Sequence, residues 1–450
     1  MRTTIITLGL LLGFSAFSQD HFAGISTSDR VGILNGDLNP AEFSNLSKKF
    51  EVNIYGMSFN VANNKIGFND ITSGKNLEDL IFAGNESVNM RLDTRVIGPS
   101  FALKIGKWGF GITTKANIKF DIVNVDPIIG NAISNNNLTL ATTILNTNSN
   151  QRFSGTSWGE VGLSAAKKII DNDKHTFSAG LTVKLLFPGS YTNVGLNNLN
   201  GQITETATGA FLTTNGPANL NIAYSGNLAE RFSQADDYTK SVFGGLNGMA
   251  TDIGFNYIWK DEKLKYKIKG GMSIRNIGSM TFNNSNNSST NYTLNIQPTI
   301  QNPQGLDLGL FENIKNLSEV ENILLAAPNN YLSQTPNKSA FKVNLPTLFT
   351  LYGDFKIVPK IYITGFMQQK MKNDEDNAQI TGLNIYSVTP RVNLGFFEAY
   401  VPISNNDISG TNVGLGFRLG GFYIGSGSII TALSDSKQAD LYTGFRWAFL

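Results

Sequence analysis

Cysteine is absent from this chain, and histidine occurs only twice, as His21 and His175. Thiol chemistry and disulfides are therefore excluded, and two separated imidazoles make histidine-rich metal sites and most histidine-based catalysis unexpected. No serine stands in a recognisable relation to either histidine, and Gly-rich pieces such as "GLNGMATDIG" lack phosphate-loop spacing. We expect no catalytic residues, no metal and no cofactor, and hence a protein that is not an enzyme.

A charge excess of one sign is also missing. The formal net charge is +2 over 450 residues, which gives no reason to expect a nucleic-acid partner. Beyond residue 18, no apolar run is long enough for a transmembrane helix. An exported protein without disulfides suits a bacterial envelope better than an animal extracellular space.

The first residues have the features of a secretory signal. Arg2 provides the charged start, residues 5–14 form an apolar core, and Ala16-Phe17-Ser18 is a small-x-small cleavage site. Cleavage after Ser18 would leave a mature chain with no cysteine at its start, so the chain is not expected to be a lipoprotein. A buried N-terminal helix is the alternative.

Long alternating segments dominate the rest of the chain. Apolar and polar or small residues alternate without interruption from Trp108 to Ile122. Such a length is unusual for a soluble strand of about five or six residues, but it suits a tilted strand with about ten residues in a membrane. The high glycine and phenylalanine content, 45 and 30 residues, agrees with an all-β protein.

The pattern predicts fourteen antiparallel strands closing into one transmembrane β-barrel. Long connections near 63–87, 123–155, 188–238 and 283–339 alternate with tight turns, as in outer-membrane barrels but not in Greek-key sandwiches. Phase slips in residues 50–61 and at Gly98-Pro99 predict β-bulges. The predicted strands are 49–62, 88–105, 108–122, 156–170, 174–187, 239–259, 264–282, 340–357, 359–371, 380–394, 396–404, 411–420, 421–432 and 438–450.

Two of the long extracellular loops carry helical patterns. Leu310, Ile314, Leu317 and Leu324 have helical spacing, so this helix either caps the barrel mouth, meets a partner or packs against its own loop. Residues 76–83 resemble a shorter helix. The acidic run at 373–377 is expected to be a solvated turn, with a calcium site as the weaker alternative.

The alternation places many charged side chains inside the predicted barrel, where they are tolerated. One interpretation is an anion-attracting pathway, and the other is structural pairing across the barrel and with Asp29, Asp37 and Glu42 of the N-terminal segment. The inward-facing cluster consists of Arg91, Asp93, Arg95, Lys115, Lys119, Asp121, Lys184, Asp252, Arg275, Lys342, Asp354, Arg391, Arg418 and Arg446.

The stretch "LNPAEF", residues 38–43, predicts a capped helical turn ahead of the strands. Asn39 is an N-cap residue, Pro40 suits the first helical position, and Glu42 completes a capping-box pattern. We expect residues 19–48 to enter the barrel as a plug, in which Asn39 and Glu42 satisfy backbone groups while Pro40 and Ala41 lie close to the wall.

The last strand resembles the C-terminal signal that the barrel assembly machinery reads. Gly444, Trp447 and Phe449 stand in suggestive positions, although Leu450 rather than an aromatic residue ends the chain. An aromatic girdle is expected near the short-turn end of the barrel. It would comprise Trp108, Tyr257, Trp259, Tyr266 and Trp447.

Three features together resemble the long-chain fatty acid transport protein superfamily of outer-membrane barrels. They are the N-terminal segment with Asn39-Pro40-Ala41, the fourteen strands and the aromatic C-terminal strand; the Leu345-Pro346 step within a strand is similar too. Residues 23–64 more specifically resemble an uncharacterised branch, a domain of unknown function from bacteria with type IX secretion. That branch resembles the system's outer-membrane shuttle barrel. The resemblance implies a plugged barrel and leaves the cargo open.

The sequence therefore predicts a signal peptide at 1–18, a plug at 19–48 and a barrel at 49–450 in the outer membrane of a Gram-negative bacterium. One hypothesis is a transporter or channel for a hydrophobic or amphipathic small molecule. The alternative is a scaffold, or a barrel associated with type IX secretion, that binds proteins through its loops. The expected partners are outer-membrane lipid, the assembly machinery, and either a hydrophobic ligand or a secretion-system protein.

Overall fold

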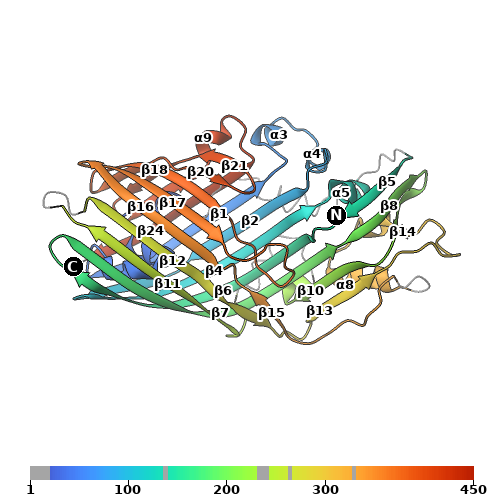
Figure 1. Ribbon diagram of the computed structural model, residues 1–450, viewed down its shortest axis with the longest axis horizontal. Helices are drawn as coiled ribbons and strands as arrows, with labels where there is room; N and C mark the ends of the chain where they lie inside the picture. Colours follow the sequence, from blue (N-terminus) through green and yellow to red (C-terminus); the bar gives the residue numbers. More distant parts are fainter. Residues whose placement is uncertain (1–20, 135–139, 231–242, 262–265, 327–330, 450) are drawn as a thin grey trace.

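A closed barrel of 14 antiparallel strands dominates the computed structural model (Figure 1). The structure describes residues 21–134, 140–230, 243–261, 266–326 and 331–449, so the predicted signal peptide and the cleavage site after Ser18 lie outside it. The number and antiparallel order of the strands are confirmed. In chain order the strands are β1 (Phe50–Asn63), β2 (Val88–Ile97) with β3 (Ser100–Ile105), β4 (Trp108–Val125), β6 (Gln151–Asp171), β7 (His175–Asn197), β11 (Gly248–Trp259), β12 (Ile268–Phe282), β15 (Phe341–Asn344) with β16 (Leu348–Val358), β17 (Ile361–Lys370), β18 (Ile385–Asn393), β19 (Phe397–Tyr400) with β20 (Ile403–Asn406), β21 (Gly410–Val413) with β22 (Leu415–Leu419), β23 (Phe422–Ser426) and β24 (Gln438–Phe449).

The ring closes where the first strand meets the last. β1 pairs antiparallel with β24 from Phe50 opposite Phe449 to Ala62 opposite Gln438. The rings of Phe50 and Phe449 stack at this seam with centroids 5.6 Å apart. Closure removes the sheet edges that would otherwise expose unpaired backbone groups.

The period-two alternation separates an apolar outer wall from a polar interior. Ile112 on β4 is half-exposed, whereas Thr113 and Lys115 are buried inside the ring. The bulge predicted in β1 occurs between Asn53 and Tyr55, and the break at Gly98-Pro99 separates β2 from β3. The Asn53 amide bridges that break by donating to the Gly98 carbonyl at 3.1 Å.

Two side chains, Tyr266 and Lys342, lie on the side of the barrel wall opposite to the predicted side. Tyr266, expected in the girdle, is buried and donates to Asp354 Oδ2 at 2.6 Å, because it lies in a connection before β12 rather than in the strand. Lys342 is exposed while Val343 is buried, because the chain leaves the sheet at residues 345–347 and the phase changes there.

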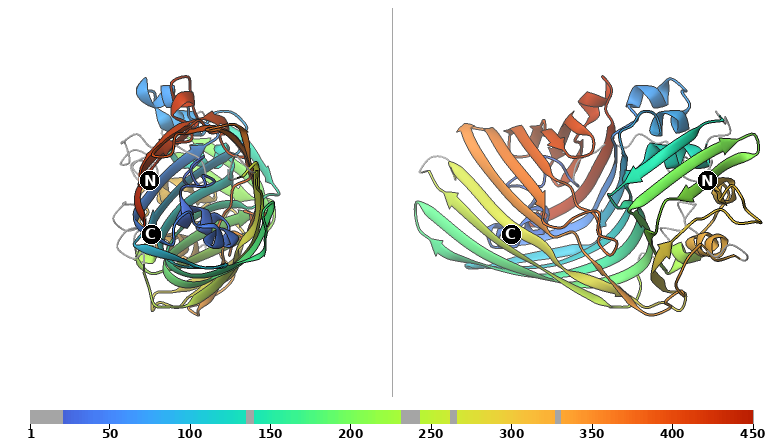
Figure 2. Two further views of the ribbon diagram at one scale, coloured as in Figure 1. Left: turned by 90° about the vertical axis from the view of Figure 1, so that its left-hand side faces the viewer. Right: turned by 45° about the vertical axis from the view of Figure 1, so that its right-hand side comes forward.

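Beyond one end of the barrel the chain builds a lobe, which the right-hand view of Figure 2 brings forward. β10 (Ala218–Ser225) continues the sheet by pairing with the far part of β7, and β13 (Ser288–Leu294) pairs with β10. A second sheet is ordered β14-β9-β8-β5. Its strands are β5 (Thr142–Thr147), β8 (Leu199–Thr206), β9 (Gly209–Thr214) and β14 (Leu306–Asp307).

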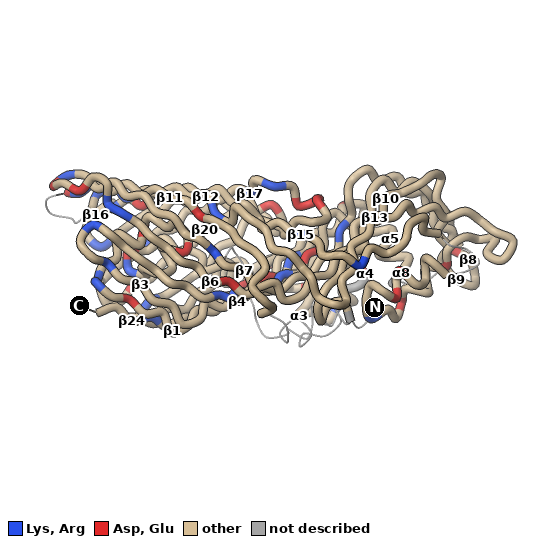
Figure 3. The backbone as a smooth tube through the Cα atoms, turned by 90° about the horizontal axis from the view of Figure 1, so that it is seen from below, with Lys and Arg blue, Asp and Glu red and all other residues tan. Residues whose placement is uncertain are grey.

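The long connections predicted at 123–155, 188–238 and 283–339 thus contain additional strands that the sequence pattern did not predict. Their strands are short and rich in Asn, Thr and Gly, so the apolar alternation that marks the barrel strands is weak in them. Charged residues are concentrated along the barrel and sparse in the lobe (Figure 3).

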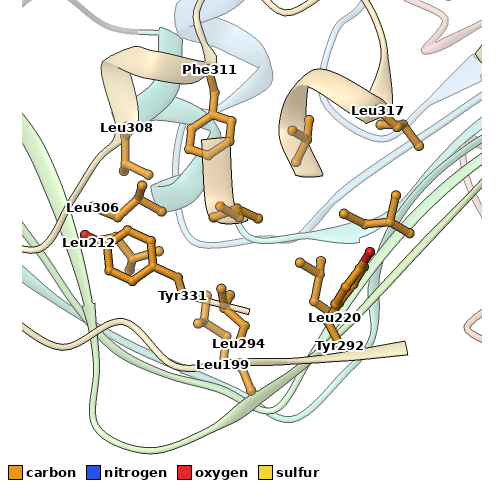
Figure 4. Close-up of a cluster of buried hydrophobic side chains, with 14 of the residues drawn as sticks. Leu199, Leu212, Leu220, Tyr292, Leu294, Leu306, Leu308, Phe311, Leu317 and Tyr331 are labelled. Carbon is orange, nitrogen blue, oxygen red and sulfur yellow. The ribbon is translucent and has the colours of Figure 1, made fainter. Parts of the chain in front are cut away.

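The lobe packs around a hydrophobic core, which also includes Leu92 of β2 and Phe120 of β4 (Figure 4). The 3₁₀ helix η2 (Leu308–Phe311) and helix α8 (Leu317–Leu325) cover the sheet strands, and Leu317 and Leu324 are buried as predicted, whereas Leu310 is exposed. The predicted helix is thus interrupted, since Asn316 caps α8 by accepting from the Glu319 amide. Buried Glu321 accepts from Tyr224 at 2.8 Å and from Tyr292 at 2.7 Å, which ties α8 to β10 and β13.

The other helices are short. None of the helices in the described part of the chain is long and apolar enough to cross a bilayer. The helix expected at 76–83 is present as α4. The short helices outside the barrel wall are α3 (Phe68–Thr72), α4 (Leu77–Ile81), α5 (Pro127–Ser134), α6 (Asn227–Glu230) and α9 (Ile429–Ala432).

Candidate functional site: the filled lumen

The N-terminal segment, residues 21–46, lies inside the ring of strands. The left-hand view of Figure 2 looks along the barrel and shows this dark blue segment within the wall. It forms helix α2 (Gly32–Leu38) and the 3₁₀ helix η1 (Pro40–Asn45). η1 contacts β3, β4, β6, β7 and β11, so it touches one continuous arc of the wall.

Asn39 begins η1 and joins it to the wall. Its Oδ1 accepts from the Ala41 amide at 3.0 Å, and its Nδ2 donates to the Phe255 carbonyl at 2.8 Å. Pro40 occupies the first helical position, where its missing N–H costs nothing. The structure thus contains the turn that "LNPAEF" predicts, with Asn39 satisfying backbone groups on both sides.

Glu42 does not complete a capping box, because the Asn39 amide donates to the Asn35 carbonyl instead. The Glu42 carboxylate faces the wall and accepts from Tyr352 Oη and from Asn256 Nδ2 at 2.9 Å. Lys269 Nζ lies 3.0 Å from its other oxygen. All three partners are buried barrel residues, so Glu42 joins strands β11, β12 and β16 to the segment.

Wall glycines let η1 approach the strands closely. A Cβ at Gly180 would lie 2.4 Å from the Pro40 carbonyl carbon, and one at Gly109 would lie 2.0 Å from the Phe43 carbonyl oxygen. At Gly254 it would lie 2.0 Å from Asn39 Oδ1. These glycines are required by the packing of backbone against backbone, and Pro40 and Ala41 lie at that contact.

Asp37 connects the segment to the charged residues in the middle of the lumen. Its carboxylate pairs with Lys115 Nζ and lies 4.0 Å from Arg95. Burial acts to raise the pKa of Asp37, but Lys115 and Arg95 outweigh it and hold the pKa below its ordinary value. Lys115 also pairs with Glu160 at 2.6 Å, so the segment shares a network with β4 and β6.

Further predicted members of the cluster lie in the same region. Asp93 pairs with Lys119 and with His21 of the segment, and Asp121 pairs with Arg91 Nε at 2.7 Å. Arg275 donates to Gln368 Oε1 at 2.6 Å. These side chains pair extensively with neighbours on adjacent strands and with the N-terminal segment, an arrangement that favours the structural interpretation of the cluster.

Arg391 and Arg418 belong to a separate group on the opposite wall. Both flank Glu398, at 3.5 Å and 2.9 Å, and the same carboxylate accepts from Ser28 of the segment at 2.7 Å. The structure thus divides the predicted cluster into two groups, each bonded to the N-terminal segment.

A second segment, residues 371–384 between β17 and β18, folds into the lumen; we call it the inner loop. Arg152 holds it by donating to the carbonyls of Asp374 and Gln379, the latter at 2.9 Å. Asp374 is buried, pairs with Lys370 at 2.8 Å and accepts from the Gly382 amide at 2.9 Å. Gln379 is also buried and donates to the Leu345 carbonyl at 3.0 Å.

The expected solvated acidic turn at 373–377 was therefore wrong for Asp374. Within the described ranges no group of His, Asp and Glu side chains could hold a metal ion. Sequence reasoning missed the inner loop because several of its contacts are with residues far away in the chain, such as Arg152, which is 222 positions from Asp374. Its only local signal is the apolar pair Ile380 and Leu383 in a polar connection, both of which are buried.

A cavity of about 30 Å³ lies between the N-terminal segment and the inner loop. This volume holds about two water molecules. Asp37 lines it from one side, Leu383 from the other, and the charged residues of β2 and β4 from the wall. A second cavity of about 40 Å³ lies beside His21 and Leu34. Neither space admits a molecule much larger than water or a small ion.

The residues of the predicted assembly signal lie at the closing seam. Trp447 and Phe449 project outward from β24, and a Cβ at Gly444 would lie 2.2 Å from Tyr423 Oη. Trp108, Tyr257 and Trp259 are also exposed on the outer wall, whereas Trp158 is buried. The role of Gly444, Trp447 and Phe449 in assembly stays a prediction.

Solved barrels with low sequence identity are similar to this chain. The toluene transporter TbuX of Ralstonia pickettii is 11% identical with a TM-score of 0.44, over 96% of this chain and 99% of that one. The toluene transporter TodX of Pseudomonas putida is 9% identical with a TM-score of 0.44, over 96% of each chain. A FadL homologue of Pseudomonas aeruginosa is 9% identical with a TM-score of 0.41, over 96% and 98%.

No curated protein matches the sequence. A family model, described as "Family of unknown function (DUF5723)", matches residues 40–427. That match begins at Pro40, within the turn that carries the sequence resemblance, and it includes most of the barrel. The expected membership of an uncharacterised family is confirmed: this chain belongs to the DUF5723 family.

Proposed function

We propose that this protein is an outer-membrane barrel that moves a hydrophobic or amphipathic small molecule, with residues 19–48 as its plug. The observation that carries the proposal is the filling of the lumen by residues 21–46, which the wall holds at Asn39, Glu42, Asp37 and Ser28. The segment is held by these polar contacts and by buried apolar side chains such as Phe22, Ile25 and Phe43, which pack against the wall. Because none of these contacts is a strand pairing, the segment can be released without unfolding the wall. The barrel pairs its own strands from end to end and needs no strand from the segment.

The surface of the barrel supports a place in the outer membrane. Large apolar side chains such as Ile112, Phe255 and Leu351 are exposed on its wall, while its interior holds buried ion pairs. A soluble protein would have to leave this apolar belt in water, whereas a bilayer stabilises it.

Passage requires movement of two elements, since the plug and the inner loop occupy the lumen one beyond the other. The inner loop is joined to β15 by a bridge between Asn344 and Gln379. Buried apolar residues near it, including Trp158, Tyr191, Met280 and Ile380, would offer a hydrophobic surface to a solute once the loop moved.

Conductance in planar bilayers tests this arrangement. Three deletion variants are compared with the full chain: one without residues 20–48, one with 373–381 replaced by a short Gly-Ser turn, and one with both changes. We expect little conductance from either single variant and a large increase from the double variant, because each element alone closes the lumen.

The control is heat-modifiable migration in detergent gels, which shows that each variant still forms a barrel. A folded double variant that conducts no better than the full chain would contradict the proposed plug. A large conductance after deletion of residues 20–48 alone would show instead that the inner loop does not form a barrier.

The alternative function is a scaffold that binds proteins through the lobe. One observation favours it: the lobe is built on a hydrophobic core, and residues 283–306, which contribute to it, contain no charged residue. Purification from the native membrane distinguishes the two functions. A co-purifying lipid or other small apolar molecule supports transport, and a stoichiometric protein supports the scaffold.

A further inference from the structure

The cavity between the plug and the inner loop presents hydrogen-bond donors that have no acceptor. Asn117, Trp158 and Arg91 line this cavity, and each is at least 95% buried. Asn117 Nδ2, Trp158 Nε1 and Arg91 Nη1 find no partner in the described part of the chain. A buried N–H group without an acceptor is unfavourable, so three of them around one cavity point to a ligand.

The orientation of the Asn117 amide is set by its neighbour. Arg95 Nε donates to Asn117 Oδ1 at 3.1 Å, which leaves Nδ2 as the group that faces the cavity. Asn117 lies directly opposite Trp158 in the pairing of β4 with β6. A β-bulge between Ser157 and Trp158 in the pairing with β7 changes the phase of the strand at the indole. Two adjacent strands therefore supply one N–H donor each.

Charge at the cavity favours an anion over water. Six cations line it, Arg91, Arg95, Lys115, Lys119, Lys184 and Arg275, against the three carboxylates Asp37, Asp93 and Glu160. Asp121 and Asp252 pair with Arg91 and Lys184 from behind. Asp374 also lies 3.8 Å from Arg91, so the excess of cations is confined to the groups that line the cavity itself.

We propose that this cavity is a binding site for one small monovalent anion, of the halide or carboxylate type. The anion accepts from Asn117 Nδ2 and Trp158 Nε1 and lies in the field of the surrounding cations. It bridges β4 and β6. The site does not depend on the transport function, since it requires only the closed lumen of the full chain.

Tryptophan fluorescence provides a direct test, because bromide quenches an indole that it touches. The protein has 4 tryptophans, and Trp108, Trp259 and Trp447 lie on the outer wall. Replacing these three with phenylalanine leaves Trp158 as the reporter. The purified full-length variant is titrated with sodium bromide in detergent, with sodium gluconate holding the ionic strength constant.

We expect saturable quenching of Trp158, with chloride competing against bromide. Acetate competes as well if a carboxylate also fits, which distinguishes the two types of anion. In the same background Asn117→Leu should raise the half-saturating bromide concentration at least tenfold. Asn221→Leu, at a buried asparagine of β10 outside the cavity, should leave it unchanged.

Heat-modifiable migration shows whether each variant is folded. If Asn117→Leu does not fold, the proposal is still tested by the bromide titration and the chloride competition in the Trp158-only protein. Quenching that rises linearly without saturation, or that chloride does not reduce, would overturn the proposal and indicate that the cavity holds water.

Discussion

At the scale of single residues, Glu42 links the N-terminal segment to the barrel wall. It is buried, and its partners Tyr352, Asn256 and Lys269 come from three different strands. Lys269 is buried too, and its only other carboxylate partner in the described ranges is Asp29, at 3.4 Å. Without Glu42, the buried ammonium group of Lys269 would keep only the more distant Asp29 as a carboxylate partner among the described residues.

Replacing Glu42 with alanine should lower the free energy of unfolding by about 3 kcal/mol, because breaking a buried ion pair leaves one charge unpaired. Urea titration of the protein in detergent, followed by intrinsic fluorescence, measures this change. The double variant Glu42→Ala/Lys269→Met should recover most of the loss, since it removes the charge that Glu42 compensated.

Asp376→Ala is the matched control, because Asp376 is an exposed carboxylate on the inner loop. If Glu42→Ala unfolds at the same urea concentration as this control, Glu42 does not anchor the plug.

At the scale of elements, the contact between η1 and the wall depends on glycine. Gly180 on β7 faces the backbone of Pro40 and Ala41, so an added methyl group has no flexible side chain to displace. Gly365 on β17 is a glycine of the same wall with no atom within 4 Å of its Cβ position. The two positions form a matched pair for testing how tightly the plug is packed.

Gly180→Ala should displace η1 and destabilise the protein by about 1–3 kcal/mol, the usual cost of overpacking. Limited proteolysis of the folded protein should then cut within residues 21–46 faster than in the parent. Gly365→Ala should be cut at the parent rate. Equal rates for all three proteins would mean that η1 does not pack as tightly as its distances indicate.

At the scale of the whole molecule, the proposed place in a bilayer depends on the apolar outer wall. Trp108, Trp259 and Trp447 lie on that wall, whereas Trp158 is 3% exposed in the interior. Reconstitution into vesicles with brominated acyl chains should therefore quench most of the fluorescence of the parent. It should leave the Trp158-only variant nearly unquenched, because that indole is shielded from lipid. Similar quenching of both proteins would contradict the placement of the barrel in the bilayer.

The strands were predictable to the extent that alternation was strong. From Trp108 to Ile122 every residue on the outward face is apolar or small, as a wall that faces lipid requires. The period of two therefore identifies both the strand and its outward face. The prediction failed at Tyr266 and Lys342, where a connection or a break changes the phase. It also failed for the strands of the lobe, whose Asn- and Thr-rich segments have a weak apolar period.

The candidate site was only partly predictable. The turn at Asn39-Pro40 could be recognised because capping involves residues adjacent in sequence. The bonds of Glu42 to Tyr352 and of Arg152 to the inner loop join residues far apart in the chain, and no local pattern indicates them.

The sequence by itself determined the all-β architecture, the number of strands and the side of the wall on which most charged residues lie, because each depends on the period of a single strand. Tertiary structure decided what fills the barrel. Closure of the ring brings the N-terminal segment, the inner loop and distant strands to one axis. In that desolvated space every buried charge and donor needs a partner, and the fold selects which partners meet.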